Sequence, residues 1–86
     1  MQFDGAVIRE HGMTFDIVVV KPHVISNRNV AEATIRGFAP AFRGLPVVLM
    51  GQDGRGRATY FGRPDLTRFM ANVPTSAIPW KRYNLN

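Results

Sequence analysis

Two stretches near the start of the chain are rich in β-forming residues, and in the second the apolar Phe15, Ile17 and Val19 recur at every other position, which is the period of a β-strand. The first stretch covers residues 3–10 and the second covers residues 13–20. His11 and Gly12 separate them, and a two-residue connection with a glycine is typical of a tight β-hairpin. Residues 17–20 are all β-branched, so we expect the second strand to lie inside the sheet with both faces covered.

The pattern then changes to that of an amphipathic helix. Apolar residues recur at helical spacing at Ala31, Ile35, Phe38 and Phe42. Residues that can cap this helix are Ser26, Asn27 and Asn29, and the step from Asn29 to Glu32 has the spacing of a capping box. Proline ends or kinks a helix, so Pro40 predicts an end near Ala39.

A second strand pair follows in the second half of the chain. Residues 47–50 are typical of a short buried strand, and residues 57–61 of its returning partner. The glycine-rich residues 51–56 between them are interpreted as a hairpin loop. The loop lacks the Lys-Ser/Thr ending of a phosphate-binding P-loop, and no helix follows it.

The last part of the chain predicts a helix and then a terminal segment. The helix is indicated by apolar residues at Leu66, Phe69, Met70 and Val73. Pro64 and Asp65 suit its first turn, and Pro74 ends it. Residues 78–85 are either an edge strand or an ordered tail, and Pro79 favours the edge position.

The predicted order of elements is therefore ββαββα, with a final β if residues 78–85 pair. We predict an α+β two-layer sandwich, in which two helices cover one face of a mostly antiparallel sheet. Without its first strand the order is βαββαβ, which resembles the ferredoxin-like domains. The length predicts one small domain over residues 1–86, with residues 75–86 as a C-terminal tail or edge strand.

Charge is distributed unevenly along the chain. The first 53 residues contain five bases and five acids, whereas the last 33 contain six bases and only Asp65. A local excess of positive charge attracts anionic partners. Nine of the eleven bases are arginine, which suits phosphate and carboxylate but is also what the codon usage of a GC-rich genome produces.

Several classes of function lack their characteristic residues. The chain has no cysteine, no His-x-x-His pair and no cluster of carboxylates, so we predict neither a metal nor a cofactor. The serines, Ser26 and Ser76, lie outside any Gly-x-Ser-x-Gly motif. The apolar runs are too short to span a membrane. The absence of cysteine fits a reducing compartment, so we expect a cytoplasmic protein with no membrane contact.

The C-terminal third combines arginines with aromatic rings, the residue types that most often dominate binding interfaces. The leading hypothesis is a non-catalytic, cytoplasmic binding or regulatory module that contacts a partner protein through this surface. The partner could equally be a second copy of the chain in a homodimer. The predicted binding residues are Arg55, Arg57, Tyr60, Arg63, Trp80, Lys81, Arg82 and Tyr83.

An alternative hypothesis is binding of single-stranded nucleic acid, in particular RNA. The order βαββαβ is shared with the RNA-recognition motif, whose third strand begins with a base and a glycine and then carries stacking rings. Residues 55–62 partly resemble that signature, because Arg55, Gly56 and Ala58 match it. Arg57 and Thr59 stand where that family has its rings.

A second alternative is a small enzyme with an anion site where the second strand leads into the helix. Helix N-termini bind anions, and bases gather at this junction. The candidate residues are Lys21, His23, Asn27, Arg28 and Asn29. His23 and Lys21 would then serve a hydrolase or transferase, whereas His11 is assigned to the hairpin turn. No residue is assigned a catalytic role.

Overall fold

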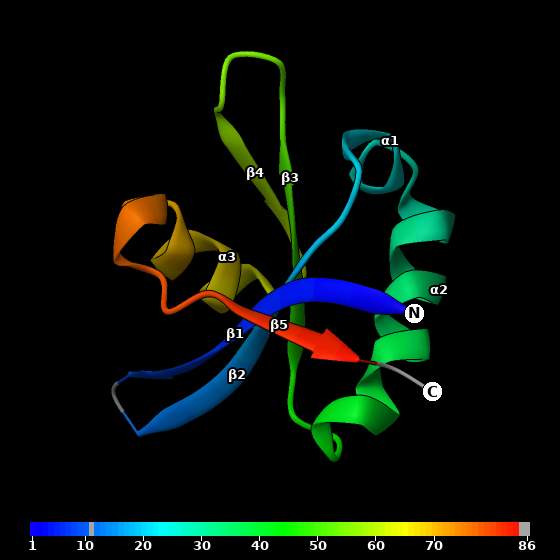
Figure 1. Ribbon diagram of the computed structural model, residues 1–86, viewed down its shortest axis with the longest axis vertical. Coiled ribbons are helices and arrows are strands. Elements are labelled where there is room, and N and C mark those ends of the chain that lie inside the picture. Colours follow the sequence, from blue (N-terminus) through cyan, green and yellow to red (C-terminus); the bar gives the residue numbers. More distant parts are fainter. Residues whose placement is uncertain (11, 85–86) are drawn as a thin grey trace.

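The computed structural model of the protein describes residues 1–10 and 12–84 (Figure 1). His11 and the end of the predicted 78–85 segment therefore lie outside the described residues. The strands are β1 (Gln2–Glu10), β2 (Met13–Val19), β3 (Val47–Gln52), β4 (Ala58–Phe61) and β5 (Lys81–Asn84). The helices are α1 (Pro22–Ile25), α2 (Arg28–Phe38) and α3 (Pro64–Met70), with short 3-10 turns η1 (Ala39–Phe42) and η2 (Thr75–Ala77). None of the helices in this part of the chain has the length and apolar character needed to cross a membrane.

The strands form one sheet in the order β4-β3-β2-β1-β5. β2 and β3 run parallel, and every other neighbouring pair is antiparallel. The predicted α+β class, the mostly antiparallel sheet and the order of elements along the chain are confirmed, including the final strand. The spatial order differs from a split βαβ arrangement, because β2 and β3 are direct neighbours joined through α1 and α2. The likeness to ferredoxin-like domains is therefore limited to the order along the chain.

The two longer helices lie on opposite faces of the sheet, so the prediction of helices on one face is wrong (Figure 1). Along β2, Ile17 packs in the apolar cluster that contains the α3 residues, whereas Val18 packs in the cluster that contains the α2 residues. Val48 and Leu49 divide between the same two clusters along β3. Both central strands are apolar on both faces, and such strands require cover on both sides. The result is three layers, which we call the α2 face, the sheet and the α3 face.

The ends of the helices show which capping residues are used. The side-chain oxygen of Asn27 accepts a hydrogen bond from the backbone N–H of Val30 at 3.2 Å and caps α2. The predicted capping box from Asn29 is therefore wrong, because the helix begins two residues too early for it. α2 ends at Phe38, next to the predicted position, and α1 is a single turn that the sequence pattern did not indicate.

Candidate functional site

The residues of the predicted basic-aromatic surface lie at two different edges of the sheet. Arg57 lies next to β4 and Tyr60 lies within it, whereas Arg82 and Tyr83 belong to β5. The other three strands lie between these two edges. Tyr60 packs on the α3 face and Tyr83 on the α2 face. The structure therefore does not bring the predicted binding residues together in one patch.

Trp80 and Arg82 make local contacts that hold the C-terminal segment in place. The indole Nε1 of Trp80 donates a hydrogen bond to the backbone oxygen of Thr75 at 3.1 Å. The guanidinium of Arg82 donates to Asp4 at 2.7 Å and to Gln2 at 3.2 Å. The Arg82 contacts join β5 to β1, and the Trp80 contact ties the residue before β5 to η2, so both side chains have a role in the fold.

The ring of Tyr83 also serves the fold. It stacks on Phe3 with 5.3 Å between ring centroids and meets Phe42 edge-on at 5.6 Å. Lys81 lies over the same ring, with its Nζ 5.7 Å from the centroid. Half-buried rings packed in this way anchor the last strand and leave little aromatic surface for a partner.

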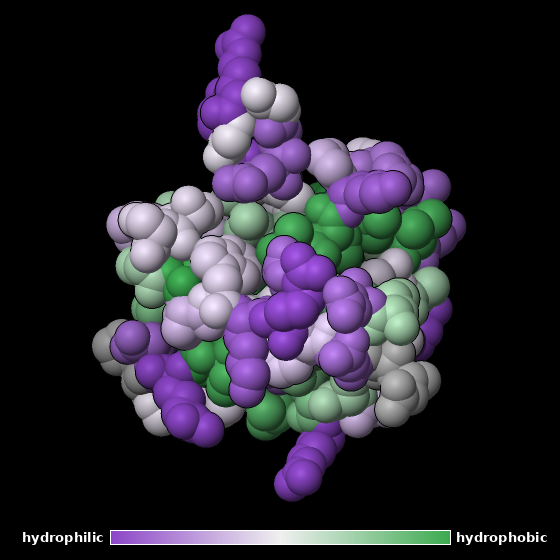
Figure 2. Space-filling view, viewed as in Figure 1, coloured by the Kyte–Doolittle hydropathy of each residue, from purple (hydrophilic) through white to green (hydrophobic). Residues whose placement is uncertain are grey.

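Asp53 organises the tip of the β3–β4 hairpin, where Arg55 and Arg57 lie. Its carboxylate accepts the backbone N–H groups of Arg55 at 2.8 Å and of Arg57 at 3.0 Å. It also accepts the Nε–H of Arg57 at 3.3 Å. These hydrogen bonds, chiefly those from the backbone, lower the pKa of Asp53. The tip is hydrophilic and projects from the body of the molecule (Figure 2).

The positive charge of the C-terminal third is partly compensated in the folded protein. The ion pairs among the described residues are Arg57–Asp53, Arg63–Asp65 and Arg82–Asp4. All three are exposed, so each contributes little to stability and is screened by salt. Arg63 lowers the pKa of Asp65, first through its side-chain hydrogen bonds. Arg55 belongs to none of these pairs and remains uncompensated.

β4 is an uncharged edge strand with one unpaired side. It consists of Ala58, Thr59, Tyr60 and Phe61, none of which is buried, and it pairs only with β3. The backbone N–H of Asp53 donates to the oxygen of Arg57 at 3.0 Å, which marks these two as a hydrogen-bonded pair of the ladder. Hydrogen-bonded and non-hydrogen-bonded pairs alternate along antiparallel strands. The backbone N–H and C=O groups of Ala58 and Tyr60 therefore point outward, away from β3.

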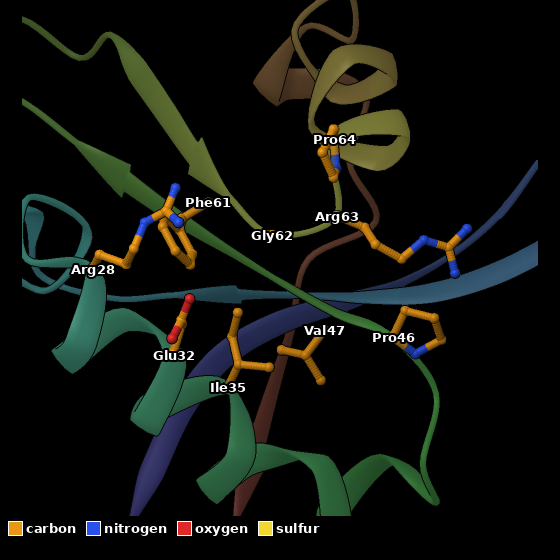
Figure 3. A pocket seen from close by; sticks show the side chains of 9 residues that line it. All are labelled: Arg28, Glu32, Ile35, Pro46, Val47, Phe61, Gly62, Arg63 and Pro64. Carbon is orange, nitrogen blue, oxygen red and sulfur yellow. The ribbon is translucent and has the colours of Figure 1, made fainter.

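A groove runs along the α2 face beside the end of β4 (Figure 3). Its volume is about 470 Å³, and its lining is Arg28, Glu32, Ile35, Pro46, Val47, Phe61, Gly62, Arg63 and Pro64. Figure 3 shows Arg28, Glu32 and Ile35 projecting from α2 toward Phe61, while the Arg63 side chain points away from them. The walls are mainly apolar and the charges lie at the rim, as in binding sites for an apolar side chain.

A second groove borders β4 on the α3 face. Its volume is about 530 Å³, and its lining is Arg57, Ala58, Thr59, Tyr60, Thr67, Met70, Ala71 and Val73. The hydroxyl of Tyr60 is buried without a hydrogen-bond partner, and burial raises the pKa of Tyr60. β4 is thus an unpaired strand with a groove on each face, which the sequence pattern did not reveal.

The candidate anion site is exposed and dispersed over two helix starts. Lys21 precedes α1 and His23 lies within it, whereas Arg28 and Asn29 lie in the first turn of α2. The side-chain oxygen of Asn27 already accepts a backbone N–H at that helix start. No hydrogen bond or ion pair joins these five described side chains, and Arg28 alone of them lines the groove of Figure 3.

Asp16 is a buried residue that belongs to none of the sites predicted from the sequence. It lies in β2 with no exposed surface, and neither carboxylate oxygen has a hydrogen-bond partner. Burial raises the pKa of Asp16 to about 6. The polar position between Phe15 and Ile17 was the available signal, since a polar residue in a central strand is unusual. Asp16 lines neither of the grooves beside β4, so we treat it as a cost to stability.

Residues 1–10 and 12–84 contain no cluster of metal ligands, because no three histidine or carboxylate side chains lie together there. Comparison of the chain with protein-family models, with curated proteins and with solved structures found no match. Its function must therefore be inferred from its own residues.

Proposed function

We propose that this protein is a non-catalytic binding module that holds an extended segment of a partner protein at the β4 edge. In this mode the segment adds a strand to the sheet, and main-chain hydrogen bonds supply affinity while side-chain pockets supply specificity. The observation that carries the proposal is an uncharged edge strand with outward backbone groups and a groove on each face.

Part of the predicted basic-aromatic surface remains in this proposal. Arg55, Arg57, Tyr60 and Arg63 surround β4 and belong to the proposed binding surface. The residues around β5 do not belong to it, because their contacts stabilise the fold. The cytoplasm remains the proposed location, on the absence of cysteine.

The expected affinity for a short segment is modest. Ala58 and Tyr60 offer two donors and two acceptors, and each hydrogen bond contributes about 1 kcal/mol net. One apolar side chain in each groove adds about 2 kcal/mol when buried. After an association cost of about 4 kcal/mol, this corresponds to a dissociation constant of about 1 mM. A partner that also contacts other surfaces of the protein would bind more tightly.

Replacement of Ala58 by proline tests the proposal. Proline removes the outward N–H of residue 58 and is tolerated on edge strands, so the β3–β4 ladder should survive. The matched control is Arg82→Ala, which changes the β5 edge. From nuclease-treated lysate of the source cell, the wild type and Arg82→Ala should capture the same partner protein in similar amounts. Ala58→Pro should capture at least tenfold less of that protein.

The folded state of Ala58→Pro is checked by circular dichroism. If the variant unfolds, hydrogen exchange on the wild-type complex decides instead, because partner binding must slow exchange at the amides of Ala58 and Tyr60. Unchanged capture by a folded Ala58→Pro, or unchanged exchange at these two amides, would contradict the proposal.

The nucleic-acid hypothesis receives less support from this arrangement. Stacking on a sheet requires rings on an open face, and here α2 packs on one face and α3 on the other. Binding of mixed-sequence single-stranded oligonucleotide to the wild type, with a steep dependence on salt, would nevertheless favour it over the protein-binding proposal.

A further inference from the structure

We infer that the segment bound at β4 carries two consecutive apolar residues, followed by acidic residues toward its C-terminus. This inference rests on the proposed strand addition at β4 and names the chemistry of the partner. It is carried by the positions of the two grooves and by the uncompensated charge at the hairpin tip.

The two grooves require apolar residues at neighbouring positions of the bound segment. Side chains of a strand alternate between the two faces of a sheet. A residue opposite Phe61 therefore enters the groove on the α2 face, where Ile35 and Val47 form the wall. The next residue lies opposite Tyr60 and enters the groove on the α3 face, beside Met70.

The positive charges at the tip of the β3–β4 hairpin favour acidic residues at the end of the segment that lies beside this tip. Arg57 lines the α3-face groove beside Ala58, and Arg55 lies at the tip without an ion pair among the described residues. The single acid of the tip, Asp53, already accepts three N–H groups from these two arginines. A partner carboxylate opposite Ala58 or Arg57 therefore meets positive charge.

The direction of the segment follows from the preference for antiparallel pairing, which is slightly more stable per residue and more frequent. An antiparallel segment starts beside Phe61 and ends beside the hairpin tip. Its apolar pair consequently precedes its acidic residues.

The same charges disfavour a second copy of this chain as the occupant. An antiparallel β4–β4 pair that joins Ala58 to Tyr60 of the second copy offers no free acid to the hairpin tip, because Arg55 would lie toward Arg63 of that copy, whose neighbour Asp65 already accepts two N–H groups from Arg63. Like charges directly opposite one another destabilise a strand pair. An acidic partner segment fits the edge better.

Four fluorescein-labelled heptapeptides test the inference by fluorescence anisotropy at low salt. The probe is Thr-Leu-Val-Thr-Asp-Asp-Ser, which places leucine opposite Phe61 and valine opposite Tyr60. The matched controls replace Asp-Asp by Lys-Lys, replace Leu-Val by Ser-Ser, or reverse the order of the sequence. We expect each control to bind at least tenfold more weakly than the probe, and Arg55→Gln to reduce the preference for aspartate over lysine about threefold.

The outcomes separate this inference from the proposed function. Equal binding of the aspartate and lysine peptides, each lost in Ala58→Pro, would overturn the acidic preference and leave strand addition standing. Tighter binding of the reversed peptide would overturn the direction. Binding of the probe that persists in a folded Ala58→Pro would contradict strand addition itself. Sedimentation of the free protein as a dimer that Ala58→Pro dissociates would keep strand addition but overturn the acidic partner segment as the occupant of this edge.

Discussion

The two edges of the sheet have the same length and opposite character. β4 and β5 each contain four residues and pair with one antiparallel neighbour. β5 begins with Lys81 and Arg82, and charged residues on a short edge strand discourage further pairing. β4 has no charged residue and has a groove on each face. One edge is therefore protected against partners, and the other is open to them.

The β5 edge also stabilises the fold. It joins the end of the chain to its first strand, because Tyr83 stacks on Phe3 and Arg82 pairs with Asp4. Substitutions there should change the stability of the fold and leave binding intact. Ala58→Pro at β4 should do the reverse, because it removes an outward N–H group and leaves the β3–β4 ladder intact, and this makes the comparison of the edges testable.

The largest expected effect on stability comes from Tyr83→Ala. The change removes the ring that packs on Phe3 and Phe42, and truncation of a packed aromatic residue costs about 3 kcal/mol. Urea unfolding should show this loss, while the folded variant keeps its affinity for the peptide probe. A loss of peptide binding without a loss of stability would reverse the roles of the two edges.

Asp16→Asn should stabilise the protein without altering either edge. Burial raises the pKa of Asp16 from its ordinary 3.8 to about 6, so the folded state holds this proton more tightly than the unfolded state. The free energy of unfolding of the wild type should therefore fall as the pH rises from about 4 to 6 and level off above it. The loss corresponds to about 3 kcal/mol at pH 7.

In Asp16→Asn this decline between pH 4 and 6 should disappear, and stability at pH 7 should rise by about 2 kcal/mol because a buried charge is replaced by a neutral amide. Urea unfolding at several pH values measures both effects. A variant with the same pH profile as the wild type would show that Asp16 is not the group responsible.

A smaller gain is expected from Tyr60→Phe at the open edge. The hydroxyl is buried without a partner, so its removal relieves a desolvation cost of about 1 kcal/mol and keeps the ring in the groove. Thermal unfolding should show a slightly more stable protein. A marked destabilisation would mean that the hydroxyl has a partner in solution.

The smallest effect is expected from Arg82→Ala at the protected edge. Its pair with Asp4 is short at 2.7 Å but exposed, so the loss should be about 0.5 kcal/mol and should shrink in high salt. Urea unfolding at low and high salt measures this. A loss above about 2 kcal/mol would show that the β5 edge depends on this charge more than its exposure allows.

Local patterns in the sequence predict most of the secondary structure but not the layers. Apolar patterns and turn residues predict the first four strands and the two longer helices, whereas residues 78–85 are open between an edge strand and a tail until the structure shows β5. The apolar stretches around Val18 and Leu49 already indicated cover on both faces. Strands with cover on both faces require layers on both sides of the sheet, so the prediction of both helices on one face conflicts with this pattern.

The candidate site was harder to predict because it depends on spatial neighbours. Arg82 is compensated by Asp4, which lies 78 positions away in the chain, so a count of charges along the sequence overstates the local potential. The open side of β4 follows from the order of the strands, which periodicity does not give. The grooves beside β4 depend on the packing of α2 and α3, which the sequence pattern does not give either.

Amide hydrogen exchange, resolved by NMR, tests the difference between the two edges most directly. In the free protein the amides of Ala58 and Tyr60 should exchange rapidly, whereas those of Thr59 and Phe61 should be protected by β3. Addition of the peptide Thr-Leu-Val-Thr-Asp-Asp-Ser should slow exchange at Ala58 and Tyr60 and leave the amides of β5 unchanged. Slower exchange at β5, with no change at Ala58 and Tyr60, would contradict the account.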